Sequence, residues 1–462
     1  MAGNMRKPAA AKQAEAIPGL ATLDLRDRLA SGALRAAEVA GAMLQRIEAV
    51  EPTVQAWAWL DSDHVMKEAA RLDALRATGR PVGPLHGMPV ALKDVIDTRG
   101  IPTECGTPLE AGRVPREDAA VVERLRAAGA LIMGKTVTTE LAFLHPSKTR
   151  NPANPAHTPG GSSSGSAAAV AAGMVPLSVG TQTGGSVIRP AAYCGTVGFK
   201  PSFGMIPRRG VLSQSPSLDT LGVFARDIEG AALLADVLFG HDPGDPSSLE
   251  MAPPRVLATA TAGPPVRPML AMVTPPGMDE HATEDTRLAL DELVDFLGDG
   301  AFGAPLPNAF NEAAAIRERI NFAEMAKCYY ALEKRGREQL SEEMRAALDA
   351  GKAVPARDYL AALDWADVLY AGLDEIFERC DAIVTPATPG PAPEGFATTG
   401  SAIFNGLWTL LGTPAVTIPV LQAANGLPMG LQLVGRRGDD ARLLRTARWL
   451  MHTLTQTPPE TE

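Results

Sequence analysis

Two glycine-rich segments that contain serine give the first indication of chemistry in this sequence. Residues 180–190 read Gly-Thr-Gln-Thr-Gly-Gly-Ser-Val-Ile-Arg-Pro and follow a short apolar run at 175–179. Glycine tolerates positive φ, so the pair before Ser186 lets successive backbone N–H groups converge on one point, as an oxyanion requires. We expect Ser186 to be a nucleophile at a strand end, although a tight turn without function has the same pattern. The expected oxyanion-hole residues are Thr183, Gly184 and Gly185.

The second segment, residues 159–166, reads Pro-Gly-Gly-Ser-Ser-Ser-Gly-Ser. This composition also suits a flexible linker, but the run lies between an apolar region and an alanine-rich helix rather than between domains. It also satisfies the G-x-S-x-G pattern of a nucleophile elbow, with Ser163 as nucleophile and a later base such as His452. That motif requires a strand directly before it, and residues 154–159 with their prolines make a poor strand. An esterase built on Ser163 is therefore kept only as an alternative.

Lys93 closes an apolar run in the third segment, which reads Gly-Met-Pro-Val-Ala-Leu-Lys-Asp at residues 87–94. A lysine at the end of a buried strand is partly desolvated, and desolvation lowers its pKa. An amine that is neutral near pH 7 can act as a general base. A surface lysine that ends a strand has the same pattern. This segment indicates a general base only in combination with the two serine segments.

Together the three segments resemble the amidase signature family. Residues 160–195 are similar to its defining sequence, and the similarity is strongest over 83–205 and most pronounced with malonamidase-like members. The resemblance implies a Ser-cisSer-Lys triad in which Ser186 is the nucleophile and Lys93 the base. Ser162, after a cis peptide bond, would relay the proton between them. A Ser–Lys arrangement replaces the histidine base of other serine hydrolases. The resemblance implies neither a metal nor a cofactor.

The sequence departs from the common family pattern at three positions, one of which is Ser164 in place of a usual glycine. Gln182 stands where an aspartate is usual, and the arginine usually found two residues after the nucleophile is displaced to Arg189. A structural ion pair is therefore expected to be missing. Arg189 has two interpretations. Either it holds a distant carboxylate or backbone carbonyls beneath the turn, or it binds the carboxylate of a substrate such as malonamate.

The elements that must position these residues alternate between strands and helices from residue 83 onward, which favours a parallel or mixed sheet covered on both faces. The expected strands are 56–60, 88–92, 130–133, 175–179, 382–385, 415–420 and 430–434. The expected helices include 119–128, capped by Asp118, 167–172 and 440–454. The resemblance implies a single α/β/α domain on a twisted mixed β-sheet flanked by helices.

The expected domain organisation is a flexible tail at 1–17 followed by one amidase signature domain over 18–455. Its parts would be N-terminal helices at 18–80, a catalytic core at 83–240, and a helical insertion with C-terminal strands at 269–455. Residues 241–268 are rich in proline, glycine and alanine without periodicity, so we expect a surface connection there.

The composition argues against several classes of function. The 462-residue chain has a net charge of −10, which disfavours nucleic acid and anionic membranes as partners. Its four cysteines form no C-x-x-C pair and its seven histidines no H-E-x-x-H, so no metal or redox site is expected. No apolar run reaches the roughly 18 residues of a membrane span, and no signal peptide is expected. We expect a cytoplasmic protein with buried free thiols.

We therefore expect an enzyme that hydrolyses amide-type C–N bonds of small molecules through an acyl-enzyme intermediate, as a monomer or homodimer. Aryl amides, carbamates and esters present a carbonyl to the same nucleophile and are alternative substrates. Two further alternatives are an amidotransferase component that supplies ammonia for tRNA-linked amidation, and a scaffold without catalysis.

Overall fold

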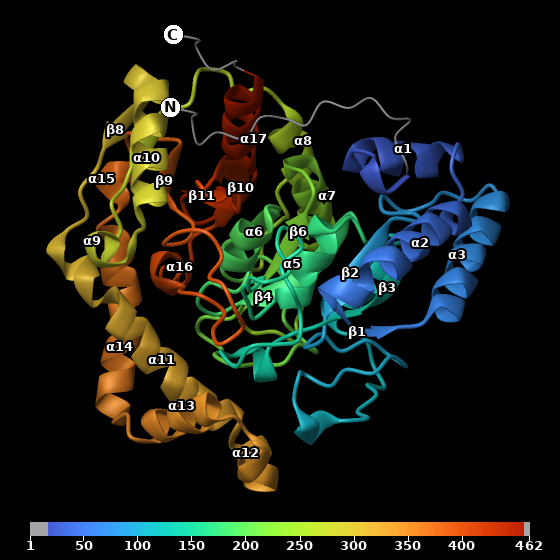
Figure 1. Cartoon of the computed structure of the whole chain (residues 1–462), viewed down its shortest axis with the longest axis horizontal. Coiled ribbons are helices and arrows are strands. Elements are labelled where there is room, and N and C mark those ends of the chain that lie inside the picture. Colours follow the sequence, from blue (N-terminus) through green and yellow to red (C-terminus); the bar gives the residue numbers. More distant parts are fainter. Residues whose placement is uncertain (1–16, 457–462) are drawn as a thin grey trace.

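A mixed sheet of eleven strands runs through the molecule, for which the computed structural model describes residues 17–456 (Figure 1). Parallel pairs join β3, β2 and β4 in one half of the sheet and β9, β7 and β8 in the other. This arrangement confirms the expected α/β class with a mixed sheet. In spatial order the strands are β1 (Trp57–Leu60), β3 (Leu131–Thr136), β2 (Pro89–Lys93), β4 (Leu177–Gln182), β6 (Thr220–Ala225), β5 (Val197–Lys200), β10 (Ala415–Gln422), β11 (Pro428–Val434), β9 (Ala382–Pro386), β7 (Leu270–Met272) and β8 (Ala301–Gly303).

Strand β2 lies between its parallel neighbours β3 and β4, and all of its residues are buried. Strands buried on both faces are continuous apolar runs, as Val90, Ala91 and Leu92 are here. Parallel neighbours end at the same edge of a sheet, where ligand sites of open α/β folds usually lie. Lys93 and Gln182 end β2 and β4 at that edge, so the segments that follow these strands meet there.

Helices cover both faces of the sheet (Figure 1). The small-residue helices α5 (Ser164–Ala171) and α6 (Ile188–Cys194) pack against each other and against β4, β5 and β10. On the other face α7 (Ile228–Leu238), α8 (Val256–Thr261) and α17 (Asp440–Gln456) pack together. The N-terminal half also contains α1 (Thr22–Ser31), α2 (Ala36–Val54), α3 (Ser62–Ala77) and α4 (Ala120–Ala127).

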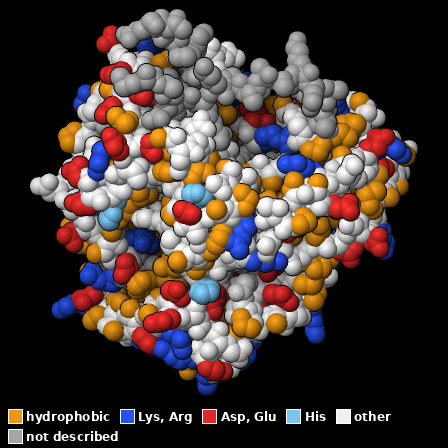
Figure 2. All heavy atoms as spheres, viewed as in Figure 1, with side chains coloured by type: hydrophobic (Ala, Val, Ile, Leu, Met, Phe, Trp, Pro, Cys, Tyr) orange, Lys and Arg blue, Asp and Glu red, His pale blue; other side chains and the backbone are white. Residues whose placement is uncertain are grey.

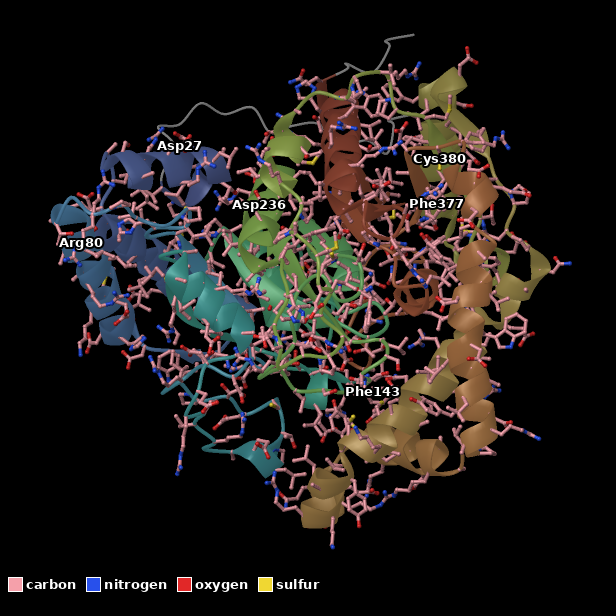
Figure 3. The ribbon with its side chains drawn as sticks, turned by 180° about the vertical axis from the view of Figure 1, so that it is seen from behind. Asp27, Arg80, Phe143, Asp236, Phe377 and Cys380 are labelled. Carbon is pink, nitrogen blue, oxygen red and sulfur yellow. The ribbon has the colours of Figure 1, made fainter. Side chains whose placement is uncertain are left out.

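A group of helices from the C-terminal half, α11 to α14, extends at the lower left of Figure 1. Seen from behind in Figure 3, Phe143 lies beside this group. Its ring meets the Phe322 ring edge-on at a centroid distance of 6.2 Å, and the Tyr329 hydroxyl donates to the Leu141 carbonyl oxygen. These contacts fix the helices to the segment that follows β3. The helices of this half are α9 (Met278–His281), α10 (Glu284–Leu297), α11 (Ala313–Cys328), α12 (Tyr330–Gly336), α13 (Glu342–Lys352), α14 (Ala356–Ala371), α15 (Asp374–Phe377) and α16 (Ile403–Leu410).

The expected strands all exist within three residues of their expected bounds, whereas two other expectations are wrong. Asp118 does not cap the helix α4, because its carboxylate accepts hydrogen bonds from the Arg99 N–H and from Arg126. Residues 241–268 are more than the surface connection without regular structure that we expected. They contain α8, whose first N–H groups donate to the Asp236 carboxylate of α7.

Other expectations concern the termini, the thiols and the surface. Residues 1–16 of the expected tail lie outside the described residues, and Ile17 already begins a short 3-10 helix. All four cysteines are free thiols, and three of them are buried. Within residues 17–456 no helix is long and apolar enough to cross a membrane. Acidic and basic side chains are mixed over the face seen in Figure 2.

Candidate active site

Lys93 is fully buried at the end of β2 and is held by two hydroxyl groups. Its Nζ donates to Ser162 Oγ and to Thr181 Oγ1, both at 2.7 Å. Thr181 lies on the parallel neighbour β4, so the sheet itself places this hydroxyl beside the amine. No carboxylate lies within ion-pair distance of Lys93 in the part of the chain that is described.

The environment of Lys93 favours a neutral amine. Its pKa is lowered to about 7, mainly by burial, and the nearby Arg189 guanidinium contributes to the lowering. The Asp219 carboxylate and the Cys105 thiol act in the opposite direction, because negative charge favours the ammonium. A substantial fraction of the amine is therefore unprotonated at neutral pH, and its lone pair then faces the Ser162 hydroxyl.

Ser162 lies in the segment between β3 and α5 and is buried. The Gly161–Ser162 peptide bond is cis, as the family resemblance implies. The Thr139 N–H donates to the Ser162 carbonyl oxygen at 3.1 Å and so ties this segment to the residues that follow β3. The hydroxyl of Ser162 is thereby directed at Lys93.

Ser186 is half-buried in the turn between β4 and α6, and among residues 17–456 no group is hydrogen-bonded to its hydroxyl. The Gln182 side chain organises this turn. Its Oε1 accepts from the N–H groups of Val187 at 2.8 Å and Ile188 at 3.0 Å, and its Nε2 donates to Thr409. The Gln182 side-chain amide thus caps α6. It does so at the position where the common family pattern has an aspartate.

The backbone before Ser186 presents unused N–H groups. In the described part of the chain no acceptor contacts the amide nitrogens of residues 183–186. The turn is held instead through other atoms, since the Thr183 hydroxyl donates to Asp219 at 2.6 Å and Thr409 donates to the Gly184 carbonyl oxygen at 2.8 Å. A side chain at Gly185 would overlap Asn405, so only glycine fits there. Free N–H groups in a fixed turn beside a hydroxyl suit an oxyanion.

The family model described as Amidase matches residues 38–444. The chain belongs to the amidase signature family. It is 32% identical over 458 residues to the A-subunit of glutamyl-tRNA(Gln) amidotransferase from Koribacter versatilis, with 91% of this chain and 95% of that protein covered.

Solved structures agree with this assignment. A structure described as "Crystal structure of amidase" has a TM-score of 0.82 and 30% identity, covering 94% of this chain and 100% of that one. A structure from a vestigial protein complex related to an s-triazine catabolic enzyme has a TM-score of 0.87 and 28% identity, covering 94% and 98%.

In this amidase-family chain Arg189 is occupied by backbone groups. Its guanidinium is buried and donates to the carbonyl oxygens of Gly400 at 2.9 Å and Gly161 at 2.6 Å. Burial lowers its pKa to about 10. Of the two interpretations of Arg189, these contacts match the one in which it binds backbone carbonyls beneath the turn. The bond to Gly161 also brings the segment of Ser162 against the start of α6.

The nucleophile elbow at Ser163 lacks the geometry it requires. Ser163 is fully buried, and its hydroxyl donates to the Thr181 carbonyl oxygen at 3.1 Å. No strand precedes it, and α5 begins one residue later. His452 is exposed on α17, on the other face of the sheet. The G-x-S-x-G match is therefore a coincidence of composition.

The structure adds residues that the sequence did not reveal. Thr181 could have been recognised as a polar side chain near the end of a buried strand. Asp219, Asn405 and Thr409 gave no signal, because they reach the turn from other parts of the chain. No cluster that could hold a metal ion occurs in residues 17–456.

Proposed function

We propose that this amidase-family protein hydrolyses small amides with Ser186 as nucleophile, Ser162 as proton relay and Lys93 as base. The observation that carries the proposal is the contact of 2.7 Å between Lys93 Nζ and Ser162 Oγ. It joins an amine with a pKa of about 7 to a serine whose segment lies against the turn of Ser186. A serine hydroxyl becomes an effective nucleophile when such a base removes its proton.

The reaction would proceed in two halves. Neutral Lys93 takes the proton of Ser162 as Ser162 takes that of Ser186, and Ser186 Oγ attacks the amide carbonyl carbon. The N–H groups of residues 183–186 stabilise the oxyanion, and one such donor is typically worth about 3–4 kcal/mol. The C–N bond breaks as the proton returns through Ser162 to the leaving amine. Water then attacks the acyl-enzyme by the same relay, giving the acid and free Ser186.

The decisive experiment traps the acyl-enzyme. Purified protein would be incubated with malonamate, an aryl anilide and an aryl carbamate, and products and adduct mass would be measured. We expect turnover of at least one substrate and an adduct on the peptide that contains Ser186. Ser186→Ala should lose both, whereas a Ser186→Ala protein that still formed the adduct would refute the assignment.

A second candidate function is that of one component of an amidotransferase. It is favoured by the A-subunits of glutamyl-tRNA(Gln) amidotransferases that match along nearly the whole chain, such as that of Salinispora arenicola at 35% identity. In that role the same triad would release ammonia for a partner protein. The test is purification of the protein from its native host. A stoichiometric partner, with amide hydrolysis only in its presence, would favour the amidotransferase role, whereas steady turnover by the isolated chain favours the hydrolase.

A further inference from the structure

A second arginine, Arg317 of α11, lies against the turn of the nucleophile. A Cβ added to Gly184 would be 3.4 Å from its Nη1, and a Cβ added to Gly406 of α16 would be 2.7 Å from its Nε. The side chain therefore passes through space that two glycines leave open. Gly184 is two residues before Ser186, a separation of at most about 7 Å along the chain.

The Arg317 guanidinium has no acceptor. In residues 17–456 no carboxylate or carbonyl oxygen is within hydrogen-bond or ion-pair distance of it, although the side chain is only partly exposed. Burial lowers its pKa, and the carboxylate of the adjacent Glu318 acts in the opposite direction. A half-buried guanidinium without a protein partner is available to bind an anion, and a carboxylate is an acceptor that suits it.

A second guanidinium lies close to Arg317. Its neighbour Arg189 feels its charge, and that guanidinium is occupied by two backbone carbonyls rather than by a carboxylate. The turn of Ser186 is therefore flanked by two guanidinium groups. Arg189 has used its terminal nitrogens, whereas all donors of Arg317 remain available.

We propose that Arg317 binds a carboxylate of the substrate, so that the enzyme selects short amides with an acid group a few carbons from the scissile carbonyl. A guanidinium binds a carboxylate through two parallel hydrogen bonds, which fixes orientation as well as charge. Because Gly184 and Ser186 are close together, the carboxylate and the scissile carbonyl of the substrate must also be separated by only a few carbons. This inference rests on the proposed hydrolase function and moves the role first considered for Arg189 to Arg317.

The test compares matched substrates that differ in charge. kcat/KM would be measured on succinamate and on butyramide for the wild type, Arg317→Ala and Arg317→Lys. Arg319→Ala, an exposed arginine on the same helix, is the control. We expect Arg317→Ala to lower the succinamate/butyramide ratio at least 50-fold, Arg317→Lys to lower it less, and Arg319→Ala to leave it unchanged. Added guanidinium should restore part of the succinamate activity of Arg317→Ala.

Binding of malonate gives a readout that does not depend on turnover. Calorimetry should detect malonate binding to the wild type and to Ser186→Ala, and Arg317→Ala should weaken it at least tenfold. Equal losses of Arg317→Ala on both amides, or unchanged malonate affinity, would overturn the role of Arg317 while leaving the triad intact. Loss of adduct formation at Ser186 is a separate outcome, which tests the hydrolase itself.

Discussion

The Thr183 hydroxyl donates a hydrogen bond of 2.6 Å to the buried carboxylate of Asp219. The same carboxylate accepts from the N–H groups of Gln214 and Ser215, and burial raises its pKa to about 6. Its negative charge favours the ammonium form of Lys93. One side chain thus holds the turn before Ser186 and raises the pKa of Lys93.

Replacing Asp219 by Asn should shift the pH dependence of the reaction. Removal of the negative charge lowers the pKa of Lys93, so the acidic limb of kcat/KM should move to lower pH while the maximal rate falls several-fold. The measurement is a pH–rate profile. Asp236→Asn is the control, since that carboxylate also accepts two backbone N–H groups but does not act on Lys93. An unmoved limb would mean that Asp219 only supports the turn.

The wild-type profile should report the free base. Because Lys93 is proposed to act as the neutral amine, kcat/KM should be constant above its pKa of about 7 and should fall about tenfold per pH unit below it. Lys93→Ala should lose at least 1000-fold at pH 7, and its residual rate should rise with pH as hydroxide replaces the amine. Near-normal rates for Lys93→Ala at pH 7 would assign the lysine a structural role.

Gln182 should be required for both stability and catalysis. Gln182→Leu leaves the buried N–H groups of Val187 and Ile188 without their acceptor, and each such loss costs about 1–3 kcal/mol. We expect a lower free energy of unfolding in urea and a lower kcat, because Ser186 directly precedes these N–H groups. Gln422→Leu, at the end of β10, removes an exposed hydrogen bond to the Gly426 carbonyl oxygen; it is the matched control and should change neither quantity. Unaltered stability of Gln182→Leu would contradict the capping role.

Gly185→Ala should disable the turn without unfolding the protein. The added methyl group would overlap Asn405 and lie 2.8 Å from the Ala402 side chain, so the N–H groups beside it must move. We expect kcat to fall at least 100-fold with an unchanged circular dichroism spectrum. Gly263→Ala, where no atom lies within 4 Å of the new Cβ, should have wild-type activity. Wild-type activity in Gly185→Ala as well would exclude this turn as the oxyanion hole.

Local patterns in the sequence predicted seven of the strands, because a buried strand depends on neighbouring residues. The same kind of pattern indicated Lys93 and Ser186 as candidate site residues. The apolar run before Lys93 and the glycine pair before Ser186 are examples. Strands β5, β6, β7 and β8 were missed. Glycine and polar residues interrupt the apolar pattern of β5 and β6, and β7 and β8 have only three residues each. The side chains that surround the site could not be predicted from the sequence either. Arg317 reaches Gly184 from 133 residues away along the chain, and no local pattern encodes such a contact.

The proposed triad residues all come from the stretch that runs from β2 to α6, whereas α11 and α16 of the C-terminal half supply side chains that face the turn from outside. The proposed catalytic residues and the proposed substrate-binding arginine thus come from different parts of the chain. Substitutions on the helix face that contacts the turn can therefore change which substrate is bound, while the residues that break the bond stay the same. Transplanting residues 313–410 between relatives should therefore transfer preference without transferring mechanism.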